Sequence, residues 1–290
     1  RRPPRSTPKP SSAASDVYKR QEGKTAVVTG GGGGIGESMC RLFAAQGMNV
    51  VVSDIDTTAA EKVAADLVAN GTKSFAVTTD VSDRDSVKAL ADKAFGEMGN
   101  VNILCNNAGV VSFAPVHEQS EKDWDWVVGV DLHGVLYGVQ AFLPRMLASG
   151  EDGHIVNTSS SAGLYAFPGI GPYVVSKYGV VALSETMYEE LASTKISVSV
   201  LCPSGVQTQI MHSQRNRPDR FGGAEDPGLG QSAPDESISP AVVAGRVLEA
   251  IQNNYLYILT HTEIREGVEN RFKAILDAFD RLEASGGTGT

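Results

Sequence analysis

Short apolar segments alternate along the chain with longer amphipathic ones. The short segments are rich in Val, Ile and Thr, as is typical of buried strands, and comprise residues 24–29, 49–54, 73–80, 101–107, 154–160, 196–203 and 255–259. Between them, apolar residues recur at helical spacing over residues 37–47, 57–71, 86–99, 122–149, 172–193 and 240–253. This order predicts an α/β fold: one doubly wound parallel sheet of about seven strands with helices on both faces.

Two segments depart from this alternation, and the predicted domain, residues 22–290, includes both. Residues 207–239 are rich in Gly, Pro and polar residues, and a loop of this length in a compact domain is usually functional or mobile, so we expect a substrate loop there. Residues 262–283 predict a C-terminal helix with one apolar face, which could serve simple packing or a subunit contact. That face consists of Ile264, Val268, Phe272, Ile275 and Phe279. We expect Thr57 or Thr58 to cap the second helix.

Charge is distributed unevenly over the 290 residues, whose formal net charge is −9. Residues 1–21 hold six basic residues and one acidic one, whereas the remainder holds 19 basic and 33 acidic residues, a net charge of −14. Such an acidic body is a poor partner for nucleic acid, and without a run of 18 apolar residues we expect no membrane span. We expect residues 1–21 to be a disordered, basic, Pro/Ser-rich tail, either foreign to the natural protein or a targeting segment.

Cysteine and histidine are sparse and lack metal-ligand spacing. Cys40, Cys105 and Cys202 each lie in an apolar segment, and the five histidines show no paired spacing. We therefore expect buried thiols, no metal site and a cytoplasmic location, where thiols stay reduced.

Residues 29–36, between the first strand and the first helix, read TGGGGGIG and hold six glycines in eight positions. At such a turn the first N–H groups of the helix point outward and favour an anion, and absent side chains let a pyrophosphate approach the backbone. A glycine run could also be a flexible surface loop, but its position between strand and helix favours a dinucleotide site. The candidate binding residues are Gly30, Gly33, Gly34, Ile35 and Gly36.

Asp54 ends the second strand, 18 residues after Gly36. In a doubly wound sheet this position faces the adenosine ribose, where a carboxylate accepts hydrogen bonds from the ribose hydroxyls and repels a 2′-phosphate. No Lys or Arg follows before Lys62. Asp54 and its neighbour Ile55 therefore predict binding of NAD rather than NADP, although an Asp at this point could also cap the next helix.

Tyr173 and Lys177 are four residues apart on a predicted helix, so both side chains lie on one face. Ser160 ends the fifth predicted strand, at the edge of the sheet where ligands bind. A phenol with a pKa of about 10 is a poor base at neutral pH. A nearby ammonium group and a cationic nicotinamide ring would stabilise its phenolate. Ser160 would then hold the substrate oxygen by a hydrogen bond.

Together these residues resemble the short-chain dehydrogenase/reductase family, in its branch of single-domain enzymes of roughly 250 residues with a Rossmann-like fold. The matching motifs follow the family order over about residues 22–260. They are Thr29-Gly30-x-x-x-Gly34-x-Gly36, Asp80-Val81, Asn106-Asn107-Ala108-Gly109, Ser160, Tyr173-x-x-x-Lys177 and Pro203…Thr208.

The resemblance implies roles for residues that the pattern alone leaves unassigned. It implies that Asp80 and Val81 contact adenine and that Asn106 and its neighbours stabilise the sheet and line the cofactor. The implied cofactor residues in those neighbours are Asn107, Ala108 and Gly109. It also implies that the stretch from Pro203 binds the nicotinamide end, with Val206 and Thr208 on its amide.

Two positions depart from the family pattern. An Asn that helps to hold a water beside the lysine is replaced by Asp131, in the stretch GVDLHGV, so we expect an added charge near Lys177 and count Asp131 with the catalytic residues. A residue that merely kinks the long helix is the alternative. Ser204 replaces the Gly of a Pro-Gly pair, and there we expect only a changed turn.

These observations lead us to expect an NAD-dependent oxidoreductase acting on a secondary alcohol or ketone, and a homodimer or homotetramer. The substrate is expected to be apolar or aromatic, from the candidate pocket residues Phe113, Tyr165, Phe167, Ile170, Ile210, Met211 and Phe221. The C-terminal part is similar to bacterial dehydrogenases of benzylic secondary alcohols from lignin-type aryl ethers. An epimerase or dehydratase of the longer family branch fits the glycine spacing less well. An NAD-binding sensor with little catalysis is the alternative from another functional class.

Overall fold

The computed structural model describes residues 21–224 and 237–285. Except for Gln21, the predicted basic tail of residues 1–21 therefore lies outside the described residues. The same holds for residues 225–236 of the predicted substrate loop.

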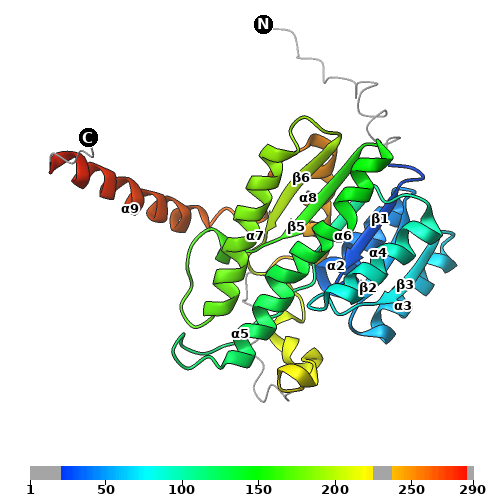
Figure 1. Ribbon diagram of the computed structural model, residues 1–290, viewed down its shortest axis with the longest axis horizontal. Coiled ribbons are helices and arrows are strands. Elements are labelled where there is room, and N and C mark those ends of the chain that lie inside the picture. Colours follow the sequence, from blue (N-terminus) through cyan, green and yellow to red (C-terminus); the bar gives the residue numbers. More distant parts are fainter. Residues whose placement is uncertain (1–20, 225–236, 286–290) are drawn as a thin grey trace, which may run out of the picture.

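Seven parallel strands form one sheet in the order β3-β2-β1-β4-β5-β6-β7, with helices on both faces (Figure 1). The strands are β1 (Thr25–Thr29), β2 (Asn49–Asp54), β3 (Ser74–Thr78), β4 (Ile103–Asn106), β5 (Gly153–Thr158), β6 (Ile196–Cys202) and β7 (Tyr257–Leu259). This confirms the predicted Rossmann-like doubly wound fold, with all seven strands near their predicted positions.

Both faces of the central strands are buried, which explains the apolar runs at their centres, such as Val50–Val52 of β2. Successive residues of β1 point to opposite sides: Ala26 and Val28 belong to one core cluster and Val27 to the other. The first cluster packs against helices α2 (Gly34–Ala45), α3 (Thr57–Ala69) and α8 (Pro240–Asn253). The second cluster packs against the remaining long helices of the body, α4 (Arg84–Met98), α6 (Gly134–Ser149) and α7 (Gly171–Glu190).

The predicted cap of α3 is wrong. Its N-cap residue is Asp56, whose side chain accepts a hydrogen bond from the backbone N–H of Ala59, so that Thr57 and Thr58 already belong to the first helical turn. Both Asp and Thr are good N-cap residues, and which one takes the position depends on where β2 ends.

The long helix predicted at 122–149 consists of three parts. Helix α5 (Glu121–Val128) leads into a π-helical turn, η1 (Gly129–His133), which continues as α6. Over Glu121–Ser149 this stretch is long and apolar enough to cross a membrane, with a mean hydropathy of 1.3 in its most apolar window, but 56% of that window is buried inside the protein. Phe142 and Met146 pack in the second core cluster, so contact with the sheet accounts for the apolar composition.

Strand order reverses between β1 and β4, whose carboxyl ends therefore diverge into a crevice where ligands of such sheets bind. Thr29 ties the two ends together. Its hydroxyl donates to the carbonyl of Cys105 and accepts the N–H groups of Asn107 and Ala108. Beyond β6, the described part of the predicted irregular segment contains two short 3₁₀ turns, η3 (Ile210–Asn216) and η4 (Asp219–Phe221). The predicted C-terminal helix is α9 (Arg265–Ala284), which extends away from the body (Figure 1).

Candidate functional site

The glycine turn packs so closely that several of its positions exclude a side chain. A Cβ on Gly36 would lie 2.0 Å from the carbonyl oxygen of Gly30, and one on Gly30 would lie 2.9 Å from the Cα of Ala108. Gly30 and Gly34 also have positive φ angles of 64° and 55°, which favour glycine. Gly33, the N-cap residue of α2, has no atom within 4 Å of the place of a Cβ. The turn therefore presents open space directly at the N-terminus of a helix.

Asp54 lies beside this turn at the end of β2. Its Oδ2 atom accepts the backbone N–H of Gly32 at 2.9 Å, and its Oδ1 atom accepts that of Asp56 at 3.0 Å. Asp54 thus does not cap the next helix, since Asp56 takes that place. The carboxylate is held against the glycine turn, in the position that the sequence predicts for a ribose-binding group.

Asp80 is already engaged by the protein. Its Oδ1 atom accepts the N–H and the hydroxyl of Ser82, and its Oδ2 atom lies 2.6 Å from Nη2 of Arg220. Because Arg220 belongs to η4, the segment after β6 reaches back to the end of β3. An adenine contact of Asp80 would have to share the carboxylate with Arg220.

A cleft of about 330 Å³ runs along the carboxyl ends of the strands and collects most of the predicted site residues. Those that line it are Gly30, Gly33, Gly34, Ile35, Asp54, Ile55, Asp80, Val81, Asn107, Ala108, Gly109, Tyr173, Lys177, Pro203 and Thr208. Four others do not: Gly36, Ser160, Asp131 and Val206.

These four residues are absent from the lining for different reasons. Gly36 packs against Gly30, and Val206 points into the first core cluster, so that only its backbone remains for a ligand contact. Ser160 is buried at the turn after β5, where its hydroxyl accepts the N–H of Ala162 and lies 3.4 Å from the carbonyl oxygen of Pro203. Asp131 is fully buried.

Tyr173 and Lys177 lie one turn apart near the start of α7. The Nζ atom of Lys177 is 5.2 Å from the centre of the Tyr173 ring and donates to the carbonyl of Thr158 at 3.2 Å. The Ser160 hydroxyl is close enough to Tyr173 to lower the pKa of the phenol. Three of the four predicted catalytic residues, Ser160 from the turn after β5 and Tyr173 and Lys177 from α7, are thus brought together, and the last two line the cleft.

Asp131 pairs with Lys177 in the interior. Its Oδ2 atom lies 3.2 Å from Nζ of Lys177, and its Oδ1 atom accepts the N–H of Val110 at 2.8 Å. The carboxylate is 0% exposed and is carried by the π-helical turn η1. Such turns are frequent at functional sites because the extra residue redirects a side chain. The long helix is thus irregular at Asp131, as the alternative interpretation of a kink supposes. The same π-helical turn places the Asp131 carboxylate beside the Lys177 ammonium group.

The charges of this cluster act on one another. Burial raises the pKa of Asp131, against the opposing effect of Lys177. Burial lowers the pKa of Lys177, but Asp131 and Tyr173 more than reverse this, so that its net shift is upward. The pKa of Tyr173 is raised by burial, lowered by Lys177 and raised again by Asp131. Asp131 thus stabilises the ammonium group while opposing the phenolate.

Replacing Asp131 with Asn should lower the pKa of Tyr173, because the repulsion between the carboxylate and the phenolate is lost. The amide oxygen can still accept the N–H of Val110. For alcohol oxidation, we expect the alkaline rise of kcat/KM to move to lower pH by on the order of one unit, with substantial activity retained. The measurement is the pH profile of both proteins, with Asp125→Asn, an exposed carboxylate on α5, as control. Superimposable profiles of wild type and Asp131→Asn, or a folded but inactive variant, would contradict this role.

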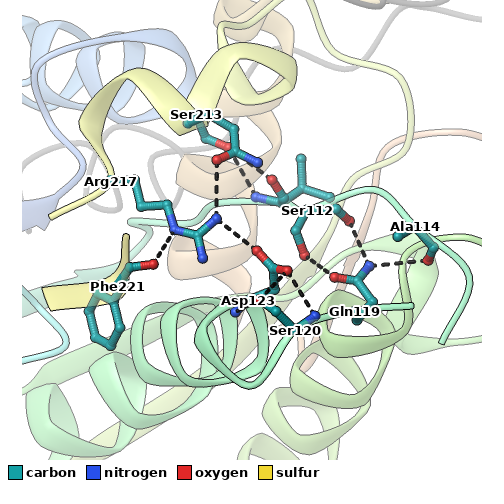
Figure 2. Close-up of polar contacts among 10 residues, drawn as sticks. Ser112, Ala114, Gln119, Ser120, Asp123, Ser213, Arg217 and Phe221 are labelled. Atoms are coloured by element: carbon teal, nitrogen blue, oxygen red, sulfur yellow. Dashed lines mark hydrogen bonds and ion pairs between the residues drawn. The ribbon is translucent and has the colours of Figure 1, made fainter. Parts of the chain in front are cut away.

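The segment after β6 is anchored to α5 by a buried arginine (Figure 2). Arg217 is 7% exposed, and its Nη1 atom lies 2.7 Å from Oδ1 of Asp123. Its Nε atom donates a hydrogen bond to the carbonyl of Phe221. Its guanidinium group also lies 4.9 Å from the centre of the Trp126 ring. A hydrogen bond from the N–H of Val111 to the hydroxyl of Ser213 adds a second link. These contacts hold η3 and η4 against α5, and η3 lines the main cleft through Ile210, Ser213, Arg215 and Asn216.

A second cavity of about 280 Å³ adjoins this network and contains two of the predicted pocket residues, Phe113 and Phe221. Of the other pocket candidates, Ile210 lines the main cleft, whereas Tyr165 and Phe167 pack on each other with ring centres 4.6 Å apart. The predicted aromatic residues thus do not form one pocket. The sequence prediction also missed residues of the main cleft wall, among them Thr158, Val110, Trp126, Val130 and Arg215.

Ser204 and the three cysteines do not line the cleft. The φ angle of Ser204 is not positive, since Asn254 alone among the described non-glycine residues has a positive φ angle. The backbone at position 204 therefore does not require the Gly of the family pattern, and Ser204 fits there without strain. Cys40, Cys105 and Cys202 are buried and free, and burial raises the pKa of each thiol. Over residues 21–224 and 237–285, no group of His, Cys, Asp or Glu is arranged to hold a metal ion.

The chain is similar in sequence to a known protein family and to a characterised dehydrogenase. The model of a family described as short chain dehydrogenase matches residues 24–219. The chain is similar to the C alpha-dehydrogenase of Sphingobium sp. strain SYK-6, with 33% identity over 268 residues that cover 90% of this chain and 88% of that protein.

Two solved structures with bound cofactors are also similar. A short chain dehydrogenase/reductase from Burkholderia phymatum in complex with NAD has a TM-score of 0.84 and 38% identity, covering 88% of this chain and 94% of that one. An alcohol dehydrogenase from the archaeon Thermococcus sibiricus complexed with 5-hydroxy-NADP has a TM-score of 0.70 and 26% identity, covering 82% and 95%.

Proposed function

The chain belongs to the short-chain dehydrogenase/reductase family, and on that basis we propose that it transfers a hydride between NAD(H) and a secondary alcohol or the corresponding ketone. The observation that carries the proposal is the joint position of Tyr173 and Lys177, which line the same cleft as the glycine turn while Asp131 pairs with the lysine behind them. A dinucleotide site and an acid–base group thus share one crevice at the carboxyl edge of the sheet.

The residues of the cleft fit a nicotinamide dinucleotide. Gly33 leaves open space at the N-terminus of α2, where backbone N–H groups and the helix dipole favour a diphosphate. We propose that Asp54 holds the adenosine ribose and that Thr208, whose Cγ2 atom lies 3.0 Å from the place of a Cβ on Gly34, lies toward the nicotinamide. When bound, such a cofactor supplies the hydride chemistry.

The protein's own residues then manage the proton. In the oxidative direction, we propose that the Tyr173 phenolate takes the proton of the substrate hydroxyl, and that Ser160 holds the same oxygen by a hydrogen bond. The ammonium group of Lys177, 5.2 Å from the Tyr173 ring centre, favours the phenolate by Coulomb attraction. The carbonyl of Thr158 and the carboxylate of Asp131 keep that ammonium charged and in place.

We propose an apolar or aromatic substrate. The support comes from apolar side chains of the cleft wall, those of Val110, Trp126, Val130 and Ile210. The first three belong to the same packed cluster as Tyr173. A site lined in this way binds by burying apolar surface, while a few polar groups orient the reacting oxygen.

NAD rather than NADP is the proposed cofactor, because three carboxylates line the adenosine end of the cleft: Asp54, Asp56 and Asp80. In assays that follow NADH or NADPH absorbance over a panel of secondary alcohols, we expect wild type to prefer NAD. In Asp54→Ala, the ratio of kcat/KM for NAD over NADP should fall by about 10- to 100-fold, or about 1.4 to 2.7 kcal/mol.

The matched control is Asp66→Asn, a carboxylate on α3 that pairs with Arg41 outside the cleft, and it should leave the ratio unchanged. A wild-type preference for NADP would refute the assignment of Asp54. Binding of NADH without turnover of any alcohol or ketone would instead support a sensor.

A further inference from the structure

Helix α9 has an apolar face that nothing in the described protein covers. No residue of Arg265–Ala284 is buried, and Figure 1 shows the helix pointing away from the sheet and its helices. Phe272 is 53% exposed, Leu276 60% and Phe279 59%, and Ile275 and Leu282 are also exposed. Scattered apolar residues are normal on a surface, but a contiguous row of large ones marks an interaction site.

The N-terminal end of α9 packs on the rest of the protein, and this fixes the direction in which the helix extends. Ile264, just before the helix, is buried, and Gly267 lies so close to Tyr165 that a Cβ would meet its ring at 2.9 Å. The guanidinium of Arg271 lies 5.0 Å from the centre of the Tyr178 ring on α7. Beyond Arg271 the helix continues for 13 residues, or about 3.6 turns of 5.4 Å each, and none of these residues is buried.

The spacing of the apolar row is that of a helix–helix seam. Val268, Phe272, Ile275, Phe279 and Leu282 follow one another at intervals of four, three, four and three residues. This heptad spacing keeps one stripe facing a partner helix along its length. Val268 is partly buried, so the structure presents an exposed seam from Phe272 to Leu282, about three turns, without a second helix against it.

The order of these side chains is the same read from either end. Around the central pair Ile275–Leu276 stand two phenylalanines, and outside them two aliphatic residues, Val268 and Leu282. A two-fold interface needs such a self-complementary patch, because residue i must contact residue j while j contacts i. An antiparallel second copy centred on this pair would place apolar side chains opposite apolar side chains throughout.

Charge favours the same antiparallel arrangement. Residues 265–274 carry three basic and two acidic side chains, whereas residues 275–284 carry one basic and three acidic ones. Antiparallel packing sets the positive half against the negative half, and it also opposes the two helix dipoles. A membrane surface is the poorer occupant, because helices that lie on lipid carry mainly Lys and Arg on the polar face.

We propose that α9 is a dimerisation helix, which pairs antiparallel with α9 of a second copy of this chain around Ile275 and Leu276. This goes beyond the proposed reaction and does not depend on it. The partner is recognised by its own apolar seam and by the reversed charge order.

The first test is the mass of the full chain in sedimentation equilibrium. The variant Phe272→Glu/Phe279→Glu should have half the wild-type mass, whereas Asn270→Glu/Ala274→Glu, which adds the same charge on the opposite face, should keep it. Because no residue of α9 is buried, circular dichroism and the thermal midpoint should show that both variants fold. A monomeric wild type, or an unchanged mass in the Phe variant, would overturn the proposal.

Cross-linking tests the direction of the pair, and the native cysteines, all buried, should not interfere. Under mild oxidation, Ile275→Cys should form a covalent dimer, since this position lies near the two-fold axis. Phe272→Cys alone should not, but a mixture of Phe272→Cys and Phe279→Cys should. Self-cross-linking of Phe272→Cys would refute the antiparallel pair, and no cross-link in any variant would overturn the dimer. These readouts record mass and covalent linkage, so they are independent of whether the proposed reaction is right.

Discussion

Tyr173→Phe should abolish turnover while leaving the fold and NADH binding intact. Phe keeps the ring, its packing against the buried cluster that contains Val81, Trp126 and Val130, and its contact with the Lys177 ammonium, and removes only the ionisable hydroxyl. Positioned acid–base groups typically contribute about 10²- to 10⁴-fold to the rate, so kcat should fall by that factor. The expected result is thus a protein of normal thermal midpoint that binds NADH and does not oxidise the alcohol.

The same helix offers a matched control. Tyr178→Phe makes the identical chemical change five residues further on, at a ring that faces Arg271 of α9 and not the cleft. Its kcat should be close to that of wild type. If Tyr173→Phe kept turnover within a factor of a few, another group would be the base. A Tyr173→Phe protein that no longer binds NADH would point to a role in holding the cofactor.

Gly36→Ala should abolish cofactor binding through the backbone. The new Cβ would lie 2.0 Å from the Gly30 carbonyl oxygen and 2.7 Å from its carbon, and no side chain can move aside to relieve this. The turn or the start of α2 must shift. Overpacking of this kind costs about 1–3 kcal/mol and occasionally more, so we expect a lower thermal midpoint. A displaced turn should weaken NADH binding by about 100-fold or more, equivalent to about 2.7 kcal/mol.

Substitutions at two other glycines distinguish a displaced backbone from a filled binding site as the cause of weaker NADH binding. Gly33→Ala meets no atom within 4 Å and should fold normally, yet weaken NADH binding because its methyl group enters the open space of the turn. Gly96 of α4 also has no atom within 4 Å of the place of a Cβ. Gly96→Ala should therefore lower neither the thermal midpoint nor the affinity for NADH. Wild-type affinity in Gly36→Ala would show that the turn is not where the diphosphate lies.

Much of the fold could be predicted from the sequence, because the signals are local. Strands buried on both faces must be apolar at nearly every position, and the helices between them must be amphipathic, so the order of the elements follows from composition along the chain. The glycine turn and the Tyr173–Lys177 pair were also visible, since each depends on residues within a few positions of one another. Helix ends were less certain: Asp56 rather than Thr57 or Thr58 caps α3, because neighbouring residues with similar capping ability compete.

The connections of the site were decided only by the tertiary structure. The π-helical turn that sets Asp131 on Lys177, 46 positions further along the chain, has no periodic signal in the sequence. Neither has the ion pair between Asp123 and Arg217, which holds the segment after β6 on α5 across 94 positions. Such contacts depend on how the sheet brings distant loops to one edge. For the apolar row of α9, the periodicity could be read from the sequence. Only the three-dimensional structure shows that the rest of the described protein leaves this row exposed.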